Sequence, residues 1–139
     1  MEPKIYISSA CFLVVVLVGI LFSSLYLLRK KFMPYHAVAV GKTWDELDKN
    51  FRVLIIALMR VAGGGWLAAS TALGILLYFH FMSSEPWITW IIFLTGLSVT
   101  IPTLAATVIV RTRTNARPPV YAAVLALVLL FGGFLTAML

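Results

Sequence analysis

The apolar segment over residues 51–81, FRVLIIALMRVAGGGWLAASTALGILLYFHF, constrains this chain most, because it is long enough to cross a lipid bilayer. At about 1.5 Å of rise per residue, such a helix exceeds a hydrocarbon core of about 30 Å, so it must tilt, project or begin outside the membrane. Arg60 lies inside it. Because a charge at that depth costs on the order of 3 kcal/mol on insertion, Arg60 needs a partner or must extend to an interface.

Three further apolar segments complete a predicted set of four membrane-spanning helices. We expect these helices at about residues 5–28, 52–81, 87–110 and 120–139, within a single transmembrane domain over residues 1–139. The mean hydropathy of +1.02 excludes an ordinary water-soluble domain. The predicted fold is therefore all-α, an integral membrane bundle of four transmembrane helices.

The connector between the first two segments predicts an additional short helix. Met33-Pro34 should end any continuation of the first helix. Thr43, followed three residues later by Glu46, matches a capping box, which predicts a short interfacial helix that starts at Trp44 and leads into the second transmembrane helix.

Basic residues are distributed unevenly over the connectors. Six Lys or Arg lie in the first connector, none in the second and three in the third, against one in the amino-terminal tail. By the positive-inside rule, the basic connectors are cytoplasmic and both termini lie outside, in a bacterial inner membrane. This topology explains the net charge of +6 without a nucleic-acid partner. The run Arg29-Lys30-Lys31 either contacts anionic membrane lipids or only fixes the orientation.

A polar cluster is predicted in the cytoplasmic half of the bundle. The third helix carries a threonine stripe on one face, and Pro102 should kink this helix at a depth similar to that of Arg60. The predicted ligand-binding residues are Arg60, Ser23, Tyr26, Thr100, Thr103 and Thr107. In the alternative interpretation, Arg60 extends to lipid phosphates or caps a freed carbonyl.

Small residues on the helix faces predict close packing between helices, because glycine and alanine let membrane helices approach each other. The residues expected to serve this packing are Gly63, Gly64, Gly65, Ala69, Gly74 and Gly133. Such faces fit association with a second copy or with a larger membrane complex.

Chemistry-bearing residues are few. Cys11 is the single cysteine, and His36 and His80 should lie about a bilayer apart, so we expect no metal site and no cofactor. We expect no embedded serine close to a histidine, and the apolar segments contain no paired carboxylates. The sequence therefore predicts a non-enzymatic protein.

Several short motifs carry a resemblance to known proteins. They are Pro34-Tyr35-His36, Trp44 with Leu47, Arg60 before Gly63-Gly64-Gly65-x-Leu67-Ala68, and Thr114-x-Ala116-Arg117-Pro118-Pro119. In this combination the chain resembles small uncharacterised bacterial four-helix inner-membrane proteins, and its Arg-x-x-Gly-Gly opening is loosely similar to DoxX-like proteins. The resemblance implies no activity and no catalytic residue.

Two functional hypotheses follow from the sequence. The first is an accessory or self-associating subunit of a membrane complex, held by the small-residue faces. The second is a binding protein or small transporter for a lipophilic ligand, such as a lipid or a quinone, built on the polar cluster around Arg60.

Overall fold

The computed structural model describes residues 2–83 and 85–139, which form a bundle of helices. In chain order the described elements are α1 (Pro3–Leu28), α2 (Pro34–Val40), α3 (Lys49–Ser83), α4 (Pro86–Arg113) and α5 (Val120–Met138). Four of them, α1, α3, α4 and α5, are long and apolar enough to cross a membrane. The protein is thus a multi-pass membrane protein, and the predicted all-α bundle with four spanning helices is confirmed.

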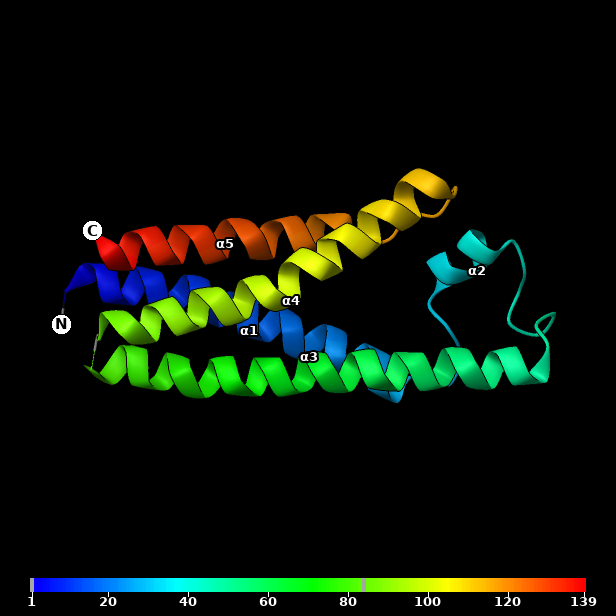
Figure 1. The fold of residues 1–139 in the computed structure, drawn as a ribbon, viewed down its shortest axis with the longest axis horizontal. Helices are drawn as coiled ribbons and strands as arrows, with labels where there is room; N and C mark the ends of the chain where they lie inside the picture. The colour runs from blue at the N-terminus through cyan, green and yellow to red at the C-terminus, as the bar shows by residue number, and fades with distance from the viewer. Residues whose placement is uncertain (1, 84) are drawn as a thin grey trace.

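The four long helices run side by side, so that both chain termini lie at one end of the bundle and α2 lies at the other (Figure 1). Helix α1 packs along α3 and α5, and α4 packs against α5 and α3. We call the end with the termini the terminal end. The opposite end, with α2 and the connectors over residues 29–48 and 114–119, is the connector end.

The main hydrophobic core occupies the terminal half of the bundle. Phe12 of α1, Ile92 of α4 and Leu130 of α5 are almost completely buried there. Gly133 of α5 lets that helix lie directly on Phe12, because a Cβ atom at position 133 would come within 2.8 Å of the ring. The small residue therefore sets how closely α1 and α5 approach.

The short helix before α3 exists, but it lies at Pro34–Val40 and does not start at Trp44. Pro34 is the first residue of α2, because proline has the φ that a first turn requires and lacks only an N–H that would have no partner there. Gly41 ends the helix with φ 70. The predicted Thr43–Glu46 pattern supplies one bond, from the Thr43 N–H to the Glu46 carboxylate at 2.7 Å, and it closes only a turn.

Helix α3 starts at Lys49, where the Asp48 carboxylate accepts the backbone N–H groups of Asn50 and Phe51. At 35 residues, it exceeds the thickness of a bilayer core. Its first turns reach the connector end, where α2 lies (Figure 1). A second small core packs the connector onto α3, which extends past the ends of the other three long helices (Figure 1). The buried members of this core are Phe32, Leu47 and Met59.

Helix α4 contains Pro102 at mid-length and bends away from α3 toward the connector end (Figure 1). A proline inside a helix removes one backbone hydrogen bond and crowds the preceding turn, which bends the axis. The bend separates the connector-end halves of α4 and α5 from α3 and leaves room inside the bundle.

Candidate functional site

A cavity of about 440 Å³ lies between the four long helices toward the connector end. All four contribute to its wall, and α2 with the connector before α5 adds the rest. The lining residues are Val15, Val18, Gly19, Phe22 and Tyr26 of α1, Tyr35 and His36 of α2, Ala62, Trp66, Ala69, Ser70 and Leu73 of α3, Gly96, Val99, Thr100, Pro102, Thr103, Ala106, Thr107 and Val110 of α4, and Pro118, Pro119, Ala122, Ala123 and Ala126.

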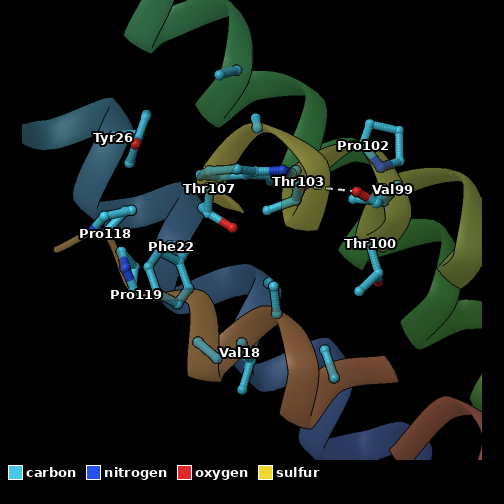
Figure 2. A pocket seen from close by; sticks show the side chains of 18 of the residues that line it. Val18, Phe22, Tyr26, Val99, Thr100, Pro102, Thr103, Thr107, Pro118 and Pro119 are labelled. Carbon is cyan, nitrogen blue, oxygen red and sulfur yellow. Dashed lines mark hydrogen bonds between the residues drawn. The ribbon is translucent and has the colours of Figure 1, made fainter. Parts of the chain in front are cut away.

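The cavity exists because small side chains face a widened interior. Ala106 of α4 and Ala122 of α5 lie on its wall, where a larger residue would fill the space. The bend at Pro102 widens the gap further. Figure 2 shows the lining side chains around this space, with Thr100, Thr103 and Thr107 of α4 on one side and Val18 and Phe22 of α1 on the other.

Aromatic side chains close the cavity toward α2. The ring of Tyr26 lies 4.8 Å from the ring of Trp66 in an edge-to-face arrangement, centroid to centroid. The hydroxyl groups of Tyr26 and Tyr35 are hydrogen-bonded to each other, which connects α1 to α2. The His36 ring packs edge-to-face on the Tyr35 ring with centroids 4.3 Å apart. This wall, formed by Tyr26, Tyr35, His36 and Trp66, is called the aromatic end below.

The lining is electrically neutral. No Lys, Arg, Asp or Glu is among the described residues that line the cavity. Burial raises the pKa of Tyr35 above its ordinary value of 10.0, and burial lowers the pKa of His36 below 6.5. Both side chains are therefore uncharged at neutral pH, and the cavity offers hydrogen bonds without a net charge.

The structure brings four of the six predicted ligand-binding residues to the cavity. Tyr26 lies at the aromatic end, and Thr100, Thr103 and Thr107 form part of the α4 wall (Figure 2). Each threonine hydroxyl donates to a carbonyl of its own helix, at 2.8 Å for Thr100 and Thr103 and 2.9 Å for Thr107. Toward the cavity they offer hydroxyl lone pairs and methyl groups.

Arg60, the residue on which the predicted cluster was centred, does not line the cavity. Its guanidinium donates to the carbonyl of Tyr26 at 3.3 Å and to the carbonyl of Arg29 at 3.1 Å. Both carbonyls belong to the last turn and cap of α1, where helical partners run out and the helix dipole is negative. Of the sequence alternatives, the one that the contacts match is capping of freed carbonyls.

Ser23 is also outside the cavity lining. It is 1% exposed, and its hydroxyl has no hydrogen-bond partner among the described residues. Its side chain lies inside the protein and away from the cavity wall, so the structure does not bring it to the predicted cluster.

The basic run at the start of the first connector is exposed at the connector end. Arg29 donates to the thioether of Met33 at 3.1 Å, and Lys31 forms an exposed ion pair with Asp45 at 3.6 Å. Lys30 is likewise exposed. The three side chains therefore lie at the surface, where contact with anionic lipid remains a prediction.

The predicted packing residues divide into two groups. A Cβ atom at Gly63 would press on Tyr26 and Leu27 of α1. A Cβ atom at Gly133 would press on Cys11 and Phe12 of the same helix. Gly74 is in ordinary contact distance of Val16, and Ala69 lines the cavity. In contrast, Gly64 and Gly65 have no neighbour within 4 Å of an added Cβ in the described structure.

A buried hydrogen-bond chain at the terminal end shows that one expectation was wrong. His80 Nε2 lies 3.0 Å from the Ser8 hydroxyl and His80 Nδ1 lies 3.1 Å from the Thr89 hydroxyl, so an embedded serine does have a histidine beside it. Ser8 also donates to the carbonyl of Ile5 at 3.1 Å. The three side chains are at most 2% exposed, which closes them to a substrate and makes them a link between α1, α3 and α4.

The sequence interpretation missed three residues of the aromatic end, Tyr35, His36 and Trp66. Tyr35 and His36 had been assigned to a polar connector. The signal that could have placed them is Pro34, which starts a helix carrying two aromatic rings directly after the basic run.

Comparison with family models, with curated proteins and with solved structures finds no match to this chain. The resemblance to DoxX-like proteins therefore stays a prediction, and the functional argument depends on the geometry of the cavity.

Proposed function

We propose that this protein binds a lipophilic molecule in the cavity between its four membrane helices. The observation that carries the proposal is the cavity itself, about 440 Å³ with an uncharged and mostly apolar lining. Binding sites for small molecules are typically of about 300–1,000 Å³, lined by apolar and aromatic groups with a few polar atoms that orient the ligand. The aromatic end and the α4 threonines supply these polar atoms.

The position of the cavity favours a ligand that arrives from the membrane. Its walls are formed by membrane-spanning helices, and its aromatic end faces the connector end, where the basic residues gather. By the positive-inside rule, this end belongs to the cytoplasmic leaflet and both termini lie outside, in an inner membrane. A lipid or quinone from that leaflet would enter with its tail among apolar side chains.

A substitution that fills the cavity tests this function. Ala106 lines the cavity and its neighbour Ala105 does not, so Ala106→Phe and Ala105→Phe add the same ring inside and outside the site. Native mass spectrometry in mild detergent should find a small molecule retained by the wild-type protein and by Ala105→Phe, and a loss of at least tenfold in Ala106→Phe. Equal retention by both variants would show that the cavity is not the binding site.

A second function, self-association or service as an accessory subunit, is favoured by the outer face of α3. Gly64 and Gly65 have open space around them in the described structure, and Ala68 and Ala72 are exposed one and two turns later. A row of small residues of this kind lets another membrane helix approach closely. Ala68→Leu should abolish a dimer or a stoichiometric partner seen by native mass spectrometry, and persistence of that species would rule this face out.

A further inference from the structure

The aromatic end holds hydrogen-bond donors that the described part of the protein does not use. One hydrogen bond joins the hydroxyl groups of Tyr26 and Tyr35. Each hydroxyl has one proton, and the bond uses one of the two. The hydroxyl that accepts keeps its own proton, for which the described residues offer no acceptor.

His36 supplies a second unused donor. The backbone N–H of Met33 donates to His36 Nδ1 at 3.3 Å, as part of the cap of α2. An Nδ1 that accepts carries no proton, so the neutral ring carries its proton on Nε2. Nε2 has no hydrogen-bond partner among the described residues, and the ring lines the cavity.

The α4 wall has the opposite character. The hydroxyl protons of Thr100, Thr103 and Thr107 already point to carbonyls of their own helix. Apart from the Ser70 hydroxyl on the α3 wall, the unused donors among the described residues that line the cavity lie at the aromatic end, and they come from neutral groups. A neutral acceptor satisfies them fully, whereas a phosphate or carboxylate would lose its hydration there without meeting a cation.

We propose that the aromatic end recognises a carbonyl oxygen, and that the ligand is a lipophilic molecule with a carbonyl-bearing head. The Tyr26–Tyr35 pair and His36 Nε2–H donate to that oxygen, and the apolar part lies along α1, α4 and α5. This inference depends on the proposed binding function. A quinone ring and the ester group of a glycerolipid both offer this chemistry.

Trp66 provides the measurement, because it lines the cavity and contacts Tyr26. The chain has 4 tryptophans, so replacing the other three with phenylalanine leaves Trp66 as the only indole. Decylubiquinone titrated into this protein in detergent should quench the fluorescence with saturation. The analogue of decylubiquinone in which both ring carbonyls are converted to methyl ethers should compete with decylubiquinone for this site, with an affinity at least tenfold weaker.

The source of the carbonyl is tested by competition. Phosphatidylcholine with ester-linked chains and its analogue with ether-linked chains differ only in the carbonyl oxygens. Displacement of decylubiquinone by the ester lipid alone supports recognition of a glycerolipid ester, and displacement by neither supports a quinone. Equal displacement by both lipids would overturn recognition of a carbonyl.

Matched variants assign the donors. Tyr26→Phe with Tyr35→Phe keeps both rings, and His36→Met keeps a weak, uncharged acceptor for the Met33 N–H while removing the donor. Each should weaken decylubiquinone binding about fivefold, the usual effect of one hydrogen bond. His36→Gln keeps both the acceptor and a donor, so its affinity should equal that of the wild type.

The outcomes separate this inference from the proposed function. If the ring with methyl ethers binds as tightly as decylubiquinone, the carbonyl inference fails and binding in the cavity stands. If neither decylubiquinone nor a brominated alkane quenches Trp66 with saturation, the proposed function fails as well. The comparison of probes uses the unaltered aromatic end, so it stays decisive even if a variant does not fold.

Discussion

The two ends of the bundle are made from the same four helices but differ in how completely their interior is filled. At the terminal end, the side chains of Phe12, Ile92 and Leu130 are at most 1% exposed. At the connector end, small residues and the bend at Pro102 leave about 440 Å³. The terminal end has the dense packing that holds a bundle together, whereas the connector end keeps open space.

One polar cluster at each end shows a similar difference. At the terminal end, Ser8 donates to the Ile5 carbonyl, so it accepts from His80 Nε2–H, and His80 Nδ1 in turn accepts from Thr89. Every donor proton of this hydrogen-bond chain therefore has an acceptor. At the aromatic end, donors remain after all described contacts are made. The two clusters therefore differ in how completely their donors are used, although the buried hydroxyl groups of Ser9 and Ser23, which do not line the cavity, also lack a partner among the described residues.

The largest expected effect comes from opening the terminal end. Gly133→Leu would press on the Phe12 ring and force α1 and α5 apart, because even a Cβ would lie 2.8 Å from that ring. We expect a loss of about 3 kcal/mol of stability, measured by thermal unfolding in detergent. The control is Gly132→Leu, whose position has no neighbour within 4 Å among the described residues. Equal unfolding temperatures for the two variants would contradict the division between the ends.

At the connector end, Arg60 links α3 to the last turn and cap of α1. Arg60→Leu removes two hydrogen bonds from a charged donor to the Tyr26 and Arg29 carbonyls. The expected cost is about 2 kcal/mol, with Arg60→Lys intermediate because an ammonium lacks the planar fork. Arg52→Leu, on the same helix, should have little effect. Unfolding of Arg60→Leu at the wild-type temperature would show that the cap contributes nothing.

The hydrogen-bond chain at the terminal end should contribute less. Ser8→Ala and Thr89→Val each remove one partner of His80. In membrane proteins such interhelical bonds are worth about 1 kcal/mol, and the double variant should lose less than the sum of the two because they share the histidine. Strict additivity in thermal unfolding would indicate that the two bonds act separately.

The smallest effect concerns acidification of the aromatic end. Burial lowers the pKa of His36 below its ordinary 6.5, so its contribution to the docking of α2 is complete above about pH 6.5 and is lost as the pH falls through the folded-state value. A histidine NMR titration should give His36 a midpoint below 6.5, with His36→Gln identifying its signal. A midpoint at or above 6.5 would mean that the ring is not buried against the cavity.

Local patterns predicted one wall of the site well. Thr100, Thr103 and Thr107 share a face of one helix, so helical periodicity alone aligned them along the cavity. The position of Tyr26 near the end of α1 also predicted its place at the cavity. Periodicity also placed Arg60 on an inward face, but it could not show that the last carbonyls of α1 would occupy the guanidinium.

Contacts between distant segments could not be read from the sequence. Ser8 and His80 are 72 positions apart, and their meeting depends on the relative height of α1 and α3. Tyr35 reaches the cavity only because α2 folds back and bonds to Tyr26. The interpretation of the connector as a polar segment was incomplete, because Phe32, Leu47 and Met59 bury it against α3.

The sequence by itself determined that this protein crosses a membrane with four helices, because the cost of burying backbone and charged groups in lipid depends on local composition. It also determined the helix faces and the bend at Pro102. The tertiary structure alone decided which polar groups find partners and where space remains, because both depend on the registry of helices packed side by side. That registry closes the terminal end around Phe12 and leaves the cavity beside Tyr26.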